Sequence, residues 1–395
     1  MFTRLLTEKD RSAAKALWGY AFETDEPFYT WYFKEIFKPE NALGIFVEDQ
    51  LICYLQLNPY KVQLRGQSFD TSYVVGVITD PGYRNKGLMR ILLPKALEEM
   101  KQRNHFVSIL MPFDTSFYRP YGWELCYSQR SYEVPLSTLH SLSQREGFWE
   151  RIYPGMNVDD LHHVYQHFLK QQHGYIERSH KGWDAILKDL MYYGGYAYLL
   201  RDHESQPVGY ILYFLKDGKF TVREVAYTNH WAQKSIFGFM YSHKSQATTA
   251  VWPAPLTDKT YLLLRDTIKP KPTNTISVYP FMCSRIVDMK ETLTHCRFEE
   301  NLDTSFTIKI EDIYAPWNEG AFRIDIQDGR ASILSLDTDE TDLSCDINTL
   351  AQLIFGAFSV EESMALDKLT VHEPSIVEQV SKVFTPKNNF INEFF

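Results

Sequence analysis

The fold of this chain is decided by Val74–Leu88, which reads VVGVITDPGYRNKGL. Its first part is apolar and rich in β-branched residues, which predicts a buried strand. A break at Asp80–Gly82 ends the strand, and the basic turn Arg84–Gly87 precedes a helical pattern that opens at Leu88. A helix that starts after such a turn directs free backbone N–H groups and its positive dipole end toward one point. The stretch therefore predicts an anion site.

A second motif follows at Ser116–Trp123, which reads SFYRPYGW. Together, in this order, the two motifs resemble those of the Gcn5-related N-acetyltransferases, which bind acetyl-coenzyme A. The R-x-x-G of Arg84–Gly87 is similar to the pyrophosphate loop of that family. The F-Y-x-x-x-G-W is similar to its next helix and exit turn. Met89 stands where the family has glycine or alanine, so one position of close backbone approach is lost. The alternative interpretation is a surface turn and a core aromatic.

Composition sets outer limits on function. A chain of 395 residues predicts two or three domains, and 44% apolar with 23% charged residues is ordinary for a globular protein. The net charge of −9 argues against a general nucleic-acid binder and favours cationic small molecules as partners.

Cysteine usage and the chain start predict a cytoplasmic protein. Five scattered cysteines form no C-x-x-C pair, which indicates reduced thiols and no zinc or other metal site. His163 and His167 share helical spacing but lack H-E-x-x-H, so we expect a solvated helix face. Residues 1–12 contain no apolar stretch long enough for a signal peptide, and no apolar run is long enough for a membrane span.

Pattern reading predicts three regions of mixed α+β structure. Residues 1–135 read as β-α-α-β-β-β-α-β-α-β, the order of the resembled fold. Residues 136–286 read as helices, a meander, a helix and a strand, which predicts a degenerate second copy. After the Pro-rich connection Lys269–Asn274, residues 287–395 give strands followed by helices, hence a small α+β domain.

This layout resembles the enhanced intracellular survival acetyltransferases. The similar segments are Glu224–Met240, Ser277–Met289 and Asp312–Ile324. The resemblance implies a catalytic acetyltransferase domain at 1–135 and a second acetyltransferase-like domain at 136–286 without a coenzyme A site. It also implies a sterol-carrier-like domain at 287–395 that delivers the C-terminus to the active site, and a homo-hexamer.

The expected cofactor is acetyl-coenzyme A, as a cosubstrate. Backbone donors of the loop would bind its phosphates, while Arg84 and Lys86 add positive charge. The resemblance adds the end of the preceding strand, which would pair with the pantetheine arm. The expected binding residues are thus Val77, Ile78, Thr79, Arg84, Asn85, Lys86, Gly87 and Leu88. The alternative for Arg84 and Lys86 is that they are solvated loop charges.

Tyr118 is the candidate general acid. A phenol with a reference pKa of about 10 is close enough to a leaving thiol to reprotonate it. In the resembled family the tyrosine of F-Y-x-x-x-G-W has that role. A core position is the alternative for Tyr118, and Tyr121 is expected to pack inside.

The resemblance implies an unusual base, the C-terminal carboxylate, here that of Phe395. The end of the chain, NNFINEFF, is apolar enough to favour docking over a frayed tail. A carboxylate with a reference pKa near 3.5 is a weak base for an ammonium near 10.4. It would therefore act by charge stabilisation, through a water, or after burial raises its pKa.

Acidic residues could attract a polyamine acceptor. Glu23, Asp25 and Glu26 lie between the first two predicted helices, and Glu393 lies beside the terminus. The alternatives are a helix-start role for Glu26 and solvated positions for the others. Some relatives place a penultimate Glu on the substrate, but Glu393 is one place farther from the end.

The expected function is acetyl-coenzyme A-dependent N-acetylation of primary amines by direct transfer in a ternary complex. Acceptors would be aminoglycoside-like, polyamine-like or lysine-like. Two alternatives stay open, namely a non-enzymatic carrier of apolar ligands and a peptide or protein acetyltransferase. A carrier would not need Arg84, Gly87 and Tyr118.

Overall fold

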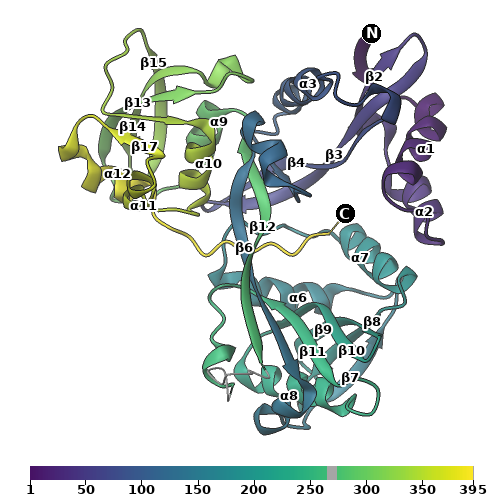
Figure 1. Ribbon diagram of the computed structural model, residues 1–395. Helices are drawn as coiled ribbons and strands as arrows, with labels where there is room; N and C mark the ends of the chain where they lie inside the picture. The colour runs from purple at the N-terminus through teal and green to yellow at the C-terminus, as the bar shows by residue number, and fades with distance from the viewer. Residues whose placement is uncertain (265–273, 395) are drawn as a thin grey trace.

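The structure is a computed structural model that describes residues 1–264 and 274–394. One large sheet runs through two stacked halves, and a smaller sheet lies beside the upper half (Figure 1). Most of the predicted connection Lys269–Asn274 and the whole of Phe395 lie outside the described residues.

The large sheet has twelve strands in the order β1-β2-β3-β4-β5-β12-β6-β11-β10-β9-β8-β7. The strands are β1 Phe2–Leu5, β2 Ala42–Val47, β3 Gln50–Leu64, β4 Gln67–Thr79, β5 Val107–Leu110, β6 Glu124–Pro135, β7 Phe148–Ile152, β8 Tyr196–Arg201, β9 Pro207–Lys216, β10 Lys219–Tyr227, β11 Thr249–Ala254 and β12 Thr275–Ile286. The helices are α1 Arg11–Ala21, α2 Phe28–Trp31, α3 Met89–Gln102, α4 Thr115–Tyr118, α5 Leu136–Leu139, α6 Asp159–Phe168, α7 His180–Tyr192 and α8 His230–Ser242.

Strands β6 and β12 join the two halves. The far end of β6 pairs with β11, whereas β12 pairs along β6 and then, from Cys283 to Ile286, with β5. The last strand of the second region is thus inserted into the first. The sequence prediction contains no strand here, because Pro280 interrupts the pattern and the register shifts directly after it.

Helix α3 follows the predicted anion loop. It confirms the helix predicted over Gly87–Asn104, with ends at Met89 and Gln102, and it continues through Pro94. Its buried side chains are Leu92, Leu93, Ala96, Leu97 and Met100, so one apolar face packs on the sheet and fixes the start of the helix.

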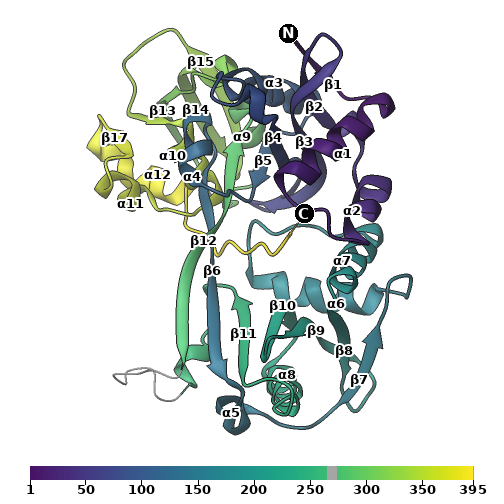
Figure 2. The same ribbon diagram turned by 45° about the vertical axis from the view of Figure 1, so that its right-hand side comes forward.

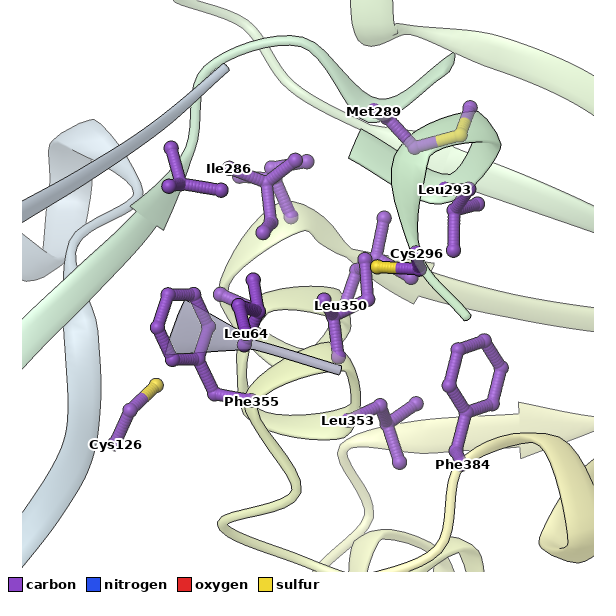
Figure 3. Packing of buried hydrophobic residues seen from close by; sticks show 14 of the residues in the cluster. Leu64, Cys126, Ile286, Met289, Leu293, Cys296, Leu350, Leu353, Phe355 and Phe384 are labelled. Carbon is purple, nitrogen blue, oxygen red and sulfur yellow. The ribbon is translucent and has the colours of Figure 1, made fainter. Parts of the chain in front are cut away.

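The smaller sheet has the order β15-β14-β13-β16-β17. Its strands are β13 Thr304–Glu311, β14 Gly320–Gln327, β15 Arg330–Leu336, β16 Leu343–Asp346 and β17 Leu369–Val371, and its helices are α9 Met289–His295, α10 Ile347–Phe355, α11 Val360–Ala365 and α12 Val377–Val383. Helix α10 is buried throughout and packs with Leu64 of β3 and Ile286 of β12 (Figure 3). The third region therefore shares a core with the first.

The tail that follows α12 crosses β6 and β12 between the two halves of the sheet and ends beside α7 (Figures 1 and 2). His173 N–H donates to Asn388 O at 2.8 Å, and Phe390 N–H donates to His173 O at 2.9 Å. Phe390, Ile391 and Glu393 are buried. The predicted docking of the chain end is confirmed as far as Phe394. No helix in the described part of the chain has the length and apolar character needed to cross a bilayer.

Candidate active site

Strands β4 and β5 separate at the predicted cofactor site. They pair in parallel only from Thr71 opposite Val107 to Tyr73 opposite Ile109, while β4 continues beside β3 to Thr79. Within the described residues, no strand pairs with the β5-facing edge of β4 beyond Tyr73. Backbone N–H and C=O groups need partners, so this edge is free to pair with an extended ligand. Val77, Ile78 and Thr79 lie on it.

The loop after β4 has the backbone of an anion cradle. The Asp80 carboxylate accepts from Gly82 N–H at 2.9 Å and fixes the first turn. Asn85 and Gly87 have φ values of +60° and +72°, in the left-handed region that glycine tolerates best. A Cβ built at Gly87 would have no neighbour within 4 Å, so the loop faces open space there.

The start of α3 is not capped by a side chain. Leu88 is the N-cap residue, and hydrogen bonding begins with Arg90 N–H, which donates to Gly87 O at 3.0 Å. The N–H groups of the preceding residues point past the helix end, where a phosphate would bind. Arg84 and Lys86 are exposed and fold back on the loop, donating to Thr79 O at 3.3 Å and Gly82 O at 2.9 Å. Both cations therefore stay at the loop.

The equivalent helix start in the second region differs. Strands β10 and β11 also pair in parallel for a short stretch, Lys219–Thr221, before α8 begins. Asn229 caps α8, its Oδ1 accepting from Ala232 N–H at 2.9 Å. Fewer donors remain for a phosphate here than at the start of α3.

Tyr118 ends the short helix α4, which Asp114 caps by accepting from Ser116 N–H at 2.8 Å. The chain then turns at Gly122, whose φ is +88° and where a Cβ would collide with the Arg285 guanidinium. The motif thus needs its glycine. Tyr121 is buried as predicted, and its ring centroid lies 4.8 Å from that of Tyr314.

The environment of Tyr118 is apolar. Its ring packs against Phe113 and Phe117 and belongs to the cluster that contains Leu88 and Cys283. Burial raises the pKa of Tyr118, with Cys283 adding to the effect. The phenol therefore holds its proton at neutral pH, as a general acid must.

The acidic loop between α1 and α2 reaches the second region. Tyr193 Oη donates to Glu23 Oε1 at 2.6 Å, and the pKa of Tyr193 is raised by burial and by nearby Glu23, Asp189 and Asp25. Glu26 instead accepts from Thr30 N–H at 3.2 Å and from Thr30 Oγ1 at 2.6 Å. Its carboxylate serves the start of α2, which is the helix-start alternative.

A cavity of about 410 Å³ is lined by residues of β6, β10, β11 and β12 and by the end of α7. Its lining includes Asp189, Tyr193, Arg223, Tyr279 and Phe394. Asp189 forms an ion pair with Arg223, and burial raises the pKa of Asp189 although Arg223 opposes the shift. No sequence motif marks Asp189 or Tyr193, because both belong to an ordinary helical pattern at α7 and its end.

The other predicted acidic residue, Glu393, is enclosed. Its side chain is 4% exposed, and Arg178 Nε donates to Glu393 Oε1 at 2.7 Å. Burial raises the pKa of Glu393, partly opposed by Arg178. A role of Glu393 toward substrate stays a prediction, and Phe395 lies outside the described residues.

The tail and Tyr118 approach the same strand. Phe394 and Phe281 of β12 have ring centroids 5.6 Å apart. Cys283, two residues along β12, belongs to the cluster around Tyr118. Phe281 belongs to a different apolar cluster from Cys283, so Phe394 and Tyr118 approach neighbouring positions of β12 from different clusters.

The cysteines lie in the interior of the protein. All five cysteines are buried and unpaired, as reduced structural thiols are. Among the described residues, no three His, Cys, Asp or Glu side chains are grouped as a metal would require.

Comparisons with known proteins agree with this geometry. Residues 3–126 and 174–286 each match a family described as an acetyltransferase (GNAT) domain, and residues 289–392 match the sterol carrier protein domain. A relative from Streptomyces avermitilis, described as an uncharacterized N-acetyltransferase, is 18% identical over 364 residues, covering 88% of this chain and 87% of its own.

Solved structures share the whole fold. A probable N-acyltransferase from Enterococcus faecalis is 22% identical with a TM-score of 0.88, over 100% of this chain and 99% of its own. A GCN5-related N-acetyltransferase from Anabaena variabilis is 22% identical with a TM-score of 0.85, over 100% of both chains. Eis1 from Mycobacterium abscessus is 15% identical with a TM-score of 0.79, over 100% of both chains.

The three domain matches account for the predicted α+β architecture. GNAT domains take an acyl-coenzyme A cosubstrate, so a non-enzymatic carrier does not describe the whole chain. The chain belongs to the GNAT N-acetyltransferases and has the Eis-like arrangement of two acetyltransferase domains followed by a sterol carrier protein domain.

Proposed function

We propose that this enzyme transfers the acetyl group of acetyl-coenzyme A to a primary amine of a cationic small molecule. Polyamine-like, lysine-like and aminoglycoside-like amines are the acceptor class. The observation that carries the proposal is the open edge of β4, which leads to the uncapped start of α3 with Tyr118 in the adjoining cluster.

In this proposal the cofactor lies along β4 and across the loop. Val77, Ile78 and Thr79 pair through their backbone with the pantetheine arm. Donors from Arg84 through Leu88, including Asn85, Lys86 and Gly87, bind the pyrophosphate. The open space at Gly87 supports this, since a large side chain there would occupy the place of the phosphates.

The proposed chemistry is direct transfer. The acceptor ammonium loses a proton, its nitrogen attacks the thioester carbonyl, and the C–N bond forms as the C–S bond breaks. Tyr118 gives its proton to the leaving thiolate. The carboxylate of Phe395 stabilises or accepts the ammonium proton, and the burial of Ile391 and Glu393 just before it supports a docked terminus.

Charge beside the cavity supports a cationic acceptor. Glu23, Asp25 and Asp189 lie near Tyr193, which lines the cavity together with Phe394 and the paired Asp189 and Arg223. Carboxylates so placed attract a second ammonium of a polyamine. Glu23 and Asp25 are thus the proposed acceptor-binding residues, whereas the predicted Glu26 serves the start of α2 and the Glu393 carboxylate is bonded to Arg178.

The remaining parts of the proposal concern the whole chain. We take 1–135 as the catalytic domain, 136–286 as a copy without a coenzyme A site and 287–395 as the domain that delivers the terminus. The self-capped start of α8 supports the second point. The proposal also includes a cytoplasmic location and a homo-hexamer.

The test is an acetylation assay with acetyl-coenzyme A and a panel of spermidine, lysine, an aminoglycoside and a short peptide. The amount of coenzyme A thiol that is released measures turnover. We expect turnover with the polycationic small amines. Turnover with the peptide alone would refute the acceptor class. A free energy of unfolding that saturating coenzyme A leaves unchanged would refute the cofactor site.

A further inference from the structure

The second acetyltransferase domain has the same strand separation as the first, but the chain's own tail is bound there. Beyond Thr221, β10 continues to Tyr227 while its parallel pairing with β11 stops. Asn392 Nδ2 donates to Arg223 O of β10 at 3.0 Å. Phe394 lines the cavity between the two strands. The tail thus occupies an opening that in the catalytic domain is free for a ligand.

A buried ion cluster fixes this contact. Arg178 donates to both Glu224 oxygens, at 2.6 and 2.7 Å, and its Nε donates to Glu393 at 2.7 Å. The three side chains are 2%, 6% and 4% exposed. Tyr210 Oη and Asn392 Nδ2 complete the partners of Glu224, at 2.6 and 3.0 Å.

The cluster is asymmetric. Arg178 and Glu224 form a complete two-pronged pair within the second domain, and Glu393 is added through the remaining Nε–H. Burying charges costs desolvation, so such a cluster is a poor source of stability compared with apolar packing. Its directional bonds instead define one position for Glu393, which Phe394 and Phe395 directly follow in the sequence.

We propose that Arg178 and Glu224 are positioning residues, which hold Glu393 and thereby set the chain terminus at the active site. The second domain then serves catalysis by holding the tail. This inference rests on the proposed role of the Phe395 carboxylate. It differs from a substrate-binding role for Glu393, because the carboxylate is used within the protein.

Two variants of one residue test it. Glu393→Ala leaves the Arg178–Glu224 pair intact, so the second domain stays folded while the tail loses its anchor. We expect kcat to fall about 10- to 100-fold, as misplacement of a reacting group does, with the KM of acetyl-coenzyme A unchanged. Glu393→Gln keeps an oxygen that accepts from Arg178 Nε and should recover most of kcat. Glu378→Ala, at an exposed carboxylate of the third domain, is the matched control.

A second readout is independent of activity. Carboxypeptidase should release the terminal phenylalanines faster from Glu393→Ala than from the wild type or Glu378→Ala. An unchanged release rate together with full kcat would overturn the proposal. A raised KM for polycationic amines with unchanged kcat would also overturn it, because Glu393 would then bind substrate.

A chain extended by a few Gly and Ser residues after Phe395 separates this inference from the proposed base. If the extension lowers kcat and Glu393→Ala lowers it no further in the extended chain, both act through the terminus, as expected. If the losses multiply, positioning is refuted. If the extended chain is fully active, the proposed base is refuted, and the tail-holding role is decided by the digestion rate.

Discussion

Replacing Gly87 by tryptophan would test the cofactor site directly. Gly87 has a φ of +72°, and a Cβ added there would have no neighbouring atom within 4 Å. A residue with a side chain loses about 1–2 kcal/mol in this left-handed backbone. That is a small part of a typical free energy of unfolding of about 5–15 kcal/mol, so the variant should fold.

The expected effect is on ligand binding. Coenzyme A at 100 times its Kd stabilises a protein that binds it by about 2.7 kcal/mol. The indole of Gly87→Trp would fill the space expected for the pyrophosphate, so this gain should vanish. Denaturant unfolding with and without coenzyme A measures the gain, and titration calorimetry measures the affinity.

Two controls separate bulk from backbone strain. Gly155→Trp carries the same kind of strain in the second domain, where φ is +82° and a Cβ also meets no atom within 4 Å. It should keep the full coenzyme A effect. Gly87→Ala should lose stability but keep binding. Full stabilisation of Gly87→Trp by coenzyme A would refute the assignment of this loop.

Three further predictions concern the acid, the tail contact and the domain junction. Tyr118→Phe should lower kcat about 100-fold and leave coenzyme A affinity unchanged; unchanged turnover would remove Tyr118 as the acid. Burial lowers the pKa of His173 to about 4, and its Nε2 accepts from Arg65 N–H, so the native state excludes a proton that the unfolded chain binds below about pH 6.5. The free energy of unfolding, measured with urea, should therefore fall by up to about 3 kcal/mol between pH 6.5 and pH 4 in the wild type, and by less in His173→Gln. A difference in free energy between the two proteins that does not change with pH would contradict this. Arg285→Met should lower the free energy of unfolding by about 3–5 kcal/mol, because the buried Asp312 carboxylate loses its two guanidinium bonds of 2.7 Å. Adding Asp312→Asn should recover part of that free energy.

The sequence by itself determined the local parts of the first acetyltransferase domain. Strand β4, the loop to Gly87 and helix α3 follow from an apolar run, a Pro-Gly break and helical spacing within a few residues. The turn at Gly122 likewise follows from a motif, although the Arg285 side chain that demands glycine there comes from β12. These signals are local because backbone preferences act over one or two turns.

Only the tertiary structure decided how distant segments meet. Pairing placed β12 between β5 and β6, although Pro280 weakens its strand pattern. Glu393 meets Arg178 across 215 residues of sequence, and Glu23 meets Tyr193 across 170. Charged residues carry no sequence mark of their partners, since an ion pair forms wherever burial brings opposite charges together. The cavity at Tyr193 and the contacts of the chain end with Arg178 are therefore properties of the packed domains.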